Sequence, residues 1–277
     1  MADQEEMRRR VRPSAGTHAI DVMALAIEWE KPLDAETLDT TAAVARKNEI
    51  ITGFLTTERK FPAFEIKVEA DQAEAPSVQN SALSVVDFIR SNPAGKIEWA
   101  LSLRPDFFSC NCTVYDRWAD VKPQALRVLG IVAGTALDRG NRIKAVGLQY
   151  SDSFKWLASD KGALKEVLRV GTPSLPAAAI DRPYLWHSHN GWFSPAAGGR
   201  RLLTVINVDY GEEPPDRVLR IHGQHKIETQ SFEDASKLMP LALTDLDEVA
   251  DNLHSSNKGI LREILSDAAL NLIGMGT

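Results

Sequence analysis

The sequence predicts an α+β fold whose strands pair mostly in an antiparallel way. Three observations support this prediction. Strand patterns outnumber helix patterns, so most neighbouring strands lack the crossover helix that a parallel pair needs. Two successive stretches each read as a β-α-β unit, which makes a loose repeat without residue-level similarity. The chain then shows three strand patterns and ends in its longest amphipathic helix.

Composition excludes several classes of protein. The 277 residues are 44% hydrophobic and 25% charged, as in an ordinary globular protein that can bury a core. The net charge of −6 argues against nucleic acid and anionic membranes as partners. Two cysteines make no disulfide framework, and we see neither a signal-peptide pattern nor an apolar run of the roughly 20 residues that span a membrane. We therefore expect a cytoplasmic protein.

Residues 1–169 alternate between strand and helix patterns. Residues 1–16 are polar, contain the basic run Arg8 to Arg12, and are predicted to form a disordered tail. Ile20 to Trp29 is apolar on both faces, as in a central strand, and Asp34 is the expected N-cap of a helix to Lys47. The elements expected next are strands at 50–57 and 61–69, a loop at 70–81, a short helix at 84–90, a hairpin of strands 97–103 and 107–115, a helix from Asp120 to Gly140, a strand at 142–150 and a helix at 162–168.

The proline-bearing stretch 170–183 is the best candidate boundary. We predict that it connects an α+β domain at 17–169 to a segment at 184–277 that packs on the same sheet system. This last segment contains three strand patterns, at 184–193, 201–210 and 218–228. Thr244 is the expected N-cap of the terminal helix, whose apolar stripe reaches Ile273, and Gly259 is the most obvious place for a break.

Three short segments carry a family resemblance. They are the first strand followed by Lys31-Pro32-Leu33 and a helix, the strand Ile143 to Tyr150, and Leu253-His254 followed by Ile260, Leu261 and Ile264. On these segments the chain resembles a sporadically distributed bacterial family of uncharacterised proteins, which has a hydrophobic-Gly-Leu-Arg-Tyr strand and a C-terminal Leu-His helix. Gln149 stands where that family has Arg, and Ser151 and Asp152 replace its polar pair. The resemblance implies an architecture but transfers no catalytic residue.

The densest concentration of unusual side chains is the segment Tyr184 to Phe193. It holds two of the six histidines and two of the six tryptophans. One interpretation places Trp186 and Phe193 in the core and Trp192 at an edge. The other places aromatic and histidine side chains at the rim of a groove, with Asn190-Gly191 as a type I′ turn. The candidate ligand-binding or partner-binding residues are Trp186, His187, His189, Asn190 and Trp192.

Metal binding is the alternative use of these histidines. His187 and His189 would project from one side of a strand, as would Cys110 and Cys112. Their spacing matches no zinc module, and buried cysteines commonly behave as small hydrophobes. We therefore predict no metal and no other cofactor.

Catalytic signatures are missing from the sequence. It contains no Gly-x-Ser-x-Gly and no phosphate-binding loop, and carboxylates such as Asp152 and Glu166 are expected at this composition. The turn at 198–201 is either a local anion contact or a plain loop. The sequence therefore favours a non-catalytic binding or assembly protein with a small ligand, a protein partner or a second copy of itself. The alternative is an enzyme or metal-binding protein that uses His187 and His189.

Overall fold

The structure, a computed structural model, describes residues 2–67, 77–160, 162–176, 180–181 and 185–276. Its strands form one ten-stranded sheet in the order β3-β4-β5-β6-β2-β7-β10-β9-β8, with β1 beside β7, and every pairing is antiparallel. The strands are β1 (Arg12–Pro13), β2 (Ile20–Trp29), β3 (Thr57–Lys67), β4 (Ser77–Ser91), β5 (Ile97–Leu103), β6 (Phe107–Cys112), β7 (Ile143–Leu157), β8 (Trp186–Pro195), β9 (Arg200–Glu213) and β10 (Asp216–Ser231). The predicted α+β class is confirmed.

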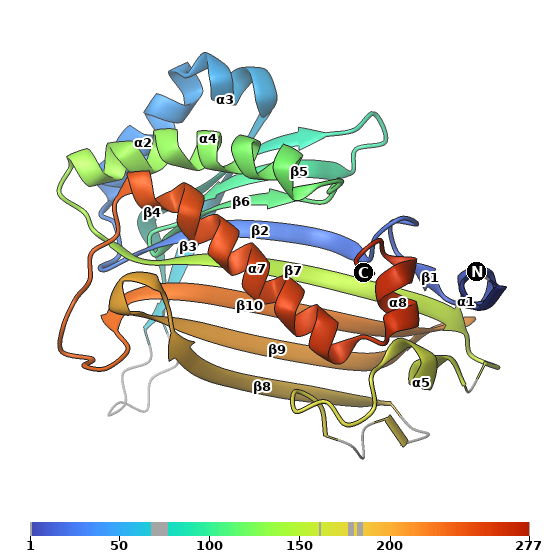
Figure 1. The fold of residues 1–277 in the computed structure, drawn as a ribbon. Helices are drawn as coiled ribbons and strands as arrows, with labels where there is room; N and C mark the ends of the chain where they lie inside the picture. Colours follow the sequence, from blue (N-terminus) through green and yellow to red (C-terminus); the bar gives the residue numbers. More distant parts are fainter. Residues whose placement is uncertain (1, 68–76, 161, 177–179, 182–184, 277) are drawn as a thin grey trace.

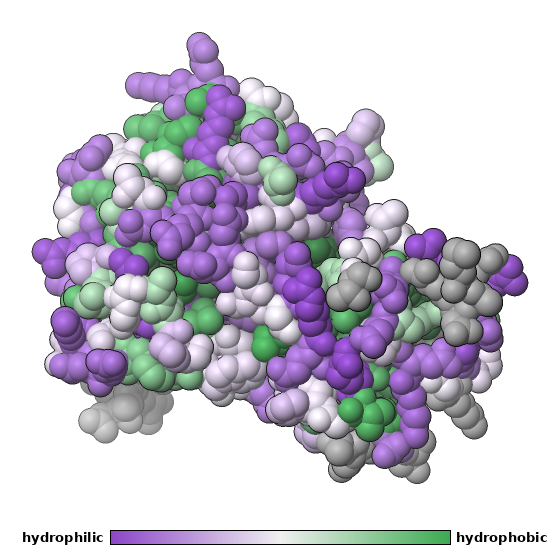
Figure 2. Space-filling view, in the orientation of Figure 1, coloured by the Kyte–Doolittle hydropathy of each residue, from purple (hydrophilic) through white to green (hydrophobic). Residues whose placement is uncertain are grey.

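The two long helices lie on one face of this sheet (Figure 1). Helix α4 (Trp118–Asp138) packs over β2 and β6, and α7 (Leu246–Ile264) crosses β7 and β10. The shorter helices are α1 (Ala2–Arg10), α2 (Ala35–Lys47), α3 (Glu49–Phe54), α5 (Ala163–Val167) and α8 (Asp267–Leu272). No helix within the described ranges has both the length and the apolar character needed to cross a membrane. Hydrophilic side chains cover most of the helix-bearing surface (Figure 2).

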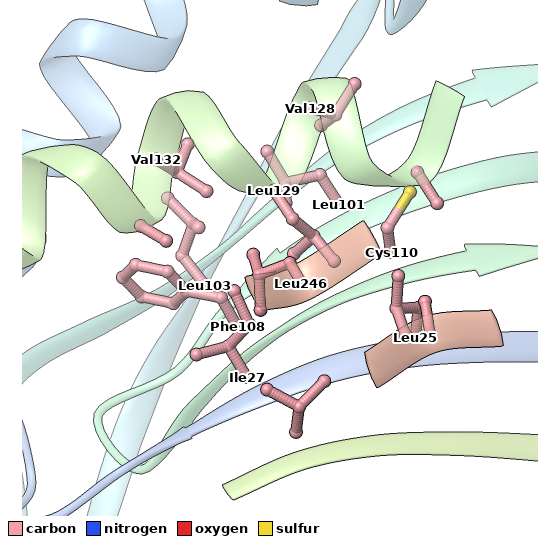
Figure 3. Close-up of a cluster of buried hydrophobic side chains, with 14 of the residues drawn as sticks. Leu25, Ile27, Leu101, Leu103, Phe108, Cys110, Val128, Leu129, Val132 and Leu246 are labelled. Atoms are coloured by element: carbon pink, nitrogen blue, oxygen red, sulfur yellow. The ribbon is translucent and has the colours of Figure 1, made fainter. Parts of the chain in front are cut away.

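Alternation along β2 produces the larger core. Leu25 and Ile27 point toward the helices and are 1% exposed, whereas the alternating residues Ala24 and Ala26 face the other way. Helix α4 presents Val128, Leu129 and Val132 at three- and four-residue spacing, and these side chains close over Leu25, Ile27 and the neighbouring strands (Figure 3). A second core lies beneath α5, α7 and α8 and is built on the far halves of β7, β9 and β10.

The N-terminal segment differs from the predicted disordered tail at 1–16. It contains α1 and β1, because Met7 and Val11 are buried in the second core. The Arg10 guanidinium forms ion pairs with Asp160 and Glu166. Part of the basic run therefore attaches the chain end to the loop before α5.

Two predicted elements have the opposite secondary structure. Residues 50–57, expected as a strand, begin with the helix α3, because the Asn48 side chain accepts hydrogen bonds from the backbone of Ile50 and Ile51 and caps it. Residues 84–90, expected as a helix, belong to β4, where Val86 and Phe88 pair with Leu103 and Leu101 of β5. The loop expected at 70–81 lies outside the described residues up to 76 and enters β4 at Ser77.

Two further expectations concern breaks in elements. Asn190-Gly191 forms no turn, because β8 pairs with β9 without interruption from Trp186 to Pro195. The terminal helix breaks after Ile264 rather than at Gly259. At the break the Arg169 and Ser266 amides donate to the carbonyls of Ile264 and Val167, and the Ser266 side chain caps α8.

Candidate functional site

A cavity of about 300 Å³ lies between α7, the N-terminal end of α4 and β7, and we call it the α7 pocket. Tyr150 and Asp152, two residues apart on β7, point to the helix-covered face, and Asn257 and Leu261 lie one turn apart on α7. The C-terminal residues Ile273 to Met275 close one side. The complete lining is His18, Ala19, Ile20, Tyr115, Asp116, Arg117, Trp118, Tyr150, Asp152, His254, Asn257, Lys258, Leu261, Ile273, Gly274 and Met275.

Asp152 is the unusual group in the α7 pocket. It lies between Ile20 of β2 and Ile221 of β10, is 2% exposed, and its Oδ2 atom has no hydrogen-bond partner among the described residues. Burial, with a smaller contribution from Asp21, raises the pKa of Asp152 to about 7. Buried carboxyl groups are normally paired, so an unpaired one that lines a cavity is a candidate ligand-binding group.

A pair of hydrogen-bonded side chains forms the wall next to Asp152. The Tyr150 hydroxyl lies 2.9 Å from Nδ1 of His254. Burial, assisted by Lys258, lowers the pKa of His254 to about 4, and burial raises the pKa of Tyr150. At neutral pH the imidazole is therefore uncharged, and its Nδ1 shares a hydrogen bond with the Tyr150 hydroxyl.

Flat aromatic surfaces complete this wall. The Trp118 and His254 rings stack with centroids 4.6 Å apart and an interplanar angle of 12°. Tyr115 contacts Tyr150 edge-on at 5.8 Å. The Trp118 indole donates to Asp251, whose other oxygen pairs with Lys122, and these contacts hold the start of α4 against α7.

A buried polar chain fixes the orientation of Asn257. The Oδ1 atom of Asn257 lies 3.2 Å from Nε2 of His225, and Nδ1 of His225 lies 3.2 Å from the Thr204 hydroxyl. Burial lowers the pKa of His225 to about 4, so the neutral ring donates from Nε2 and accepts from Thr204. The Asn257 amide nitrogen is left as a donor at the pocket. Gly223 permits this approach, since a Cβ there would lie 2.4 Å from the Asn257 oxygen.

The residues predicted from the aromatic segment lie elsewhere, on the edge strand β8. Trp186 is half-buried against Tyr210, and the Asn190 amide donates to the Ser174 carbonyl and the Ser188 hydroxyl. Trp192 is 37% exposed. Alternation puts His187 and His189 on the opposite sheet face, both exposed, so the structure does not bring the five residues together at one point.

The histidine surface on β8 includes further polar groups of β9 and β10. His187 is opposite Asp209, and the His222 ring lies 3.8 Å from the Asp209 carboxylate. Within the described ranges, no group of three or more His, Cys, Asp or Glu side chains has an arrangement that could hold a metal ion. Cys110 and Cys112 are free thiols buried in the larger core.

A second cavity, of about 390 Å³, lies on the face of the sheet opposite the helices, above small residues such as Ala24, Ala26 and Gly147. Its charged groups are already satisfied. Glu28 pairs with Lys226, and Arg104 pairs with Asp87. It therefore lacks the unpaired buried group that distinguishes the α7 pocket.

The sequence analysis did not predict the α7 pocket, although it named several of the residues that line it. Asp152 interrupts a strand of buried residues, and that is the signal that could have found it. Two segments that carry the family resemblance, Ile143 to Tyr150 and Leu253-His254, meet at the Tyr150–His254 contact, and the first strand contributes Ile20.

Comparison with known proteins adds no assignment. No family model matches the chain, so the resemblance stays a prediction, and no curated protein matches it. Among solved structures, the di-domain ARO/CYC StfQ from the steffimycin biosynthetic pathway aligns with a TM-score of 0.19 and 10% identity over 91% of this chain and 96% of that one. Similarity at that level supports no argument about function.

Proposed function

We propose that the protein binds a small organic molecule in the α7 pocket, through an amine or other hydrogen-bond donor that reaches Asp152. The observation that carries this proposal is the buried, unpaired Oδ2 atom of Asp152. An ammonium group that reaches the Asp152 carboxyl from the pocket would stabilise its ionised form, and a charge-assisted hydrogen bond is about twice as strong as a neutral one.

The remaining lining suits an apolar, flat ligand body. Trp118 and Tyr115 offer aromatic surface, and Leu261 and Met275 add aliphatic contacts. The neutral His254 and the oriented Asn257 amide supply uncharged hydrogen-bonding groups. This chemistry favours recognition of a ligand over its conversion, because the described lining has no activated nucleophile.

A pair of isosteric probes tests the proposal. Phenethylamine carries an amine and 3-phenylpropionate carries a carboxylate on similar bodies. We expect phenethylamine to bind the wild-type protein with a Kd on the order of 1 mM or tighter, as seen by ligand-observed NMR, and 3-phenylpropionate to bind weakly. Binding of the amine should be lost in Asp152→Asn and kept in Asp209→Asn, which removes a half-exposed carboxylate on the opposite face. Equal binding to all three proteins would contradict the proposal.

A second candidate function is partner binding at β8. The observation that favours it is the exposure of Trp192 (37%) and Phe193 (49%) on a ten-residue strand at the edge of the sheet. Exposed aromatic side chains on an edge strand are typical of sites that pair with another chain. Analytical ultracentrifugation of wild type and Trp192→Ala would detect self-association through this strand.

We also propose a cytoplasmic location. It is supported by the two thiols, which are reduced and buried, and whose pKa values are raised by burial, that of Cys112 to about 11. Thiols in this protonated state are not reactive and suit a reducing compartment.

A further inference from the structure

We propose that the ligand of the α7 pocket carries an amine at one end and a carboxylate at the other, with the amine at Asp152 and the carboxylate between Lys258 and Arg117. This inference rests on the proposed function, because it takes the Asp152 end of the pocket as the amine site.

The first support is a pair of cations at the mouth of the pocket. Lys258 is half-buried and Arg117 is exposed, and both line the cavity. Neither forms an ion pair with a carboxylate anywhere in the described ranges. Asp116 also lines the mouth, so the mouth holds two cations against one carboxylate.

The second support is the N-terminal end of α4, which opens at Arg117 and Trp118 in the same lining. This 21-residue helix has no side-chain hydrogen bond at its N-cap. The positive end of its dipole favours an anion at the mouth, and Asp120 in the first turn offsets part of this charge. Lys258, Arg117 and the helix end thus add the same sign of potential, opposite to that of Asp152.

The positions of these groups determine the spacing of charges in the ligand. Asp152 is 2% exposed, whereas Lys258 is half-buried and Arg117 is exposed, so the cations are the more solvent-accessible part of the lining. A molecule that satisfies both must therefore separate its two charges by its apolar body. An α-amino acid, whose charges share one carbon, fits this arrangement poorly.

Three probes with one ring system test the spacing. Phenethylamine has only the amine, L-phenylalanine has a carboxylate next to the amine, and 4-(2-aminoethyl)benzoate has a carboxylate at the opposite end. We expect the benzoate to bind wild type about fivefold more tightly than phenethylamine, which is the order expected for one partly exposed ion pair. We expect L-phenylalanine to bind no better than phenethylamine.

A lysine variant tests whether the gain in affinity of the benzoate comes from the mouth of the α7 pocket. Lys258→Gln should bring the Kd of 4-(2-aminoethyl)benzoate and the Kd of phenethylamine, both measured on this variant, to the same value. Lys237→Gln, which changes an exposed lysine in a distant loop, should preserve the advantage. If phenethylamine binds through Asp152 but the benzoate gains nothing, or gains equally in Lys258→Gln, the two-ended ligand is contradicted and the proposed function stands. If phenethylamine itself does not bind, both fail.

Discussion

Replacing Asp152 by Asn should stabilise the protein, by an amount that grows with pH. Burial raises the pKa of this carboxyl from an ordinary value of 3.8 to about 7. The folded protein therefore keeps a proton that the unfolded chain releases, and the free energy of unfolding falls as pH rises between these two values. An asparagine side chain at this position would have the same shape and no charge to bury, so the substitution removes this dependence.

The magnitude follows from the width of that range. Between pH 5 and pH 7 the ionisation of Asp152 should cost about 1.4 kcal/mol for each pH unit, or about 3 kcal/mol in all. The advantage of Asp152→Asn over wild type should accordingly increase by about 3 kcal/mol from pH 5 to pH 8. Contributions from other titrating groups cancel in this difference, because both proteins contain them.

Urea denaturation at pH 5, 6, 7 and 8 measures this difference directly, with similar denaturant slopes in both proteins as the check that the same surface unfolds. Asp209→Asn serves as the control and should show no such trend, since the Asp209 side chain is 46% exposed on the opposite face of the sheet. A difference between Asp152→Asn and wild type that does not change with pH would refute the assignment of Asp152 as a buried, unpaired carboxyl. If Asp152→Asn gains stability and loses amine binding, the unpaired Asp152 carboxyl contributes to binding at the expense of stability.

Four further predictions concern the surroundings of the pocket and the edges of the fold. Gly223→Ala should destabilise the protein by about 1–3 kcal/mol and weaken amine binding, because the new methyl displaces Asn257, whereas Gly147→Ala, whose nearest neighbour would be 3.7 Å away, should be tolerated in the same urea titration. Stability should fall as pH decreases from 6.5 toward 4, since the unfolded chain protonates His225 and His254 before the folded protein does, and this loss should shrink in His225→Gln if the buried ring is neutral. Met7→Ala should lower the free energy of unfolding by about 2–3 kcal/mol in thermal or urea unfolding, because Met7 is buried. An unchanged midpoint would contradict this burial and favour the predicted disordered tail. Trp192→Ala should change the free energy of unfolding by less than about 1 kcal/mol and abolish any self-association seen by ultracentrifugation, so loss of folding would place Trp192 in the core.

The fold class could be predicted because it depends on local periodicity. The central strand Ile20–Trp29, the helix capped by Asp34 and the apolar stripe of α4 follow directly from the spacing of apolar residues. Residues 84–90 were assigned wrongly because their apolar residues suit either period, and pairing with β5 decides between them. Residues 50–57 were assigned to a strand because their β-branched residues favour strands, whereas the cap at Asn48 starts a helix there.

The site could not be predicted in the same way, because its parts come from distant segments. Asp152 is one acid among many in the sequence, and only the sheet register and the crossing of α7 bury it beside Tyr150 and His254. The aromatic segment, in contrast, is conspicuous in composition, yet β8 divides its side chains between two faces of an edge strand. The most conspicuous segment of the sequence and the buried polar residue of β7 therefore indicate two different candidate sites.

The most direct test of an amine site at Asp152 is the titration of its side-chain carboxyl by carbon NMR, assigned by comparison with Asp152→Asn, with and without saturating phenethylamine. Without ligand the pKa should be about 7. With the amine bound, the neighbouring positive charge should lower it by at least one pH unit. An ordinary pKa without ligand, or a raised pKa that the amine leaves unchanged, would contradict the account.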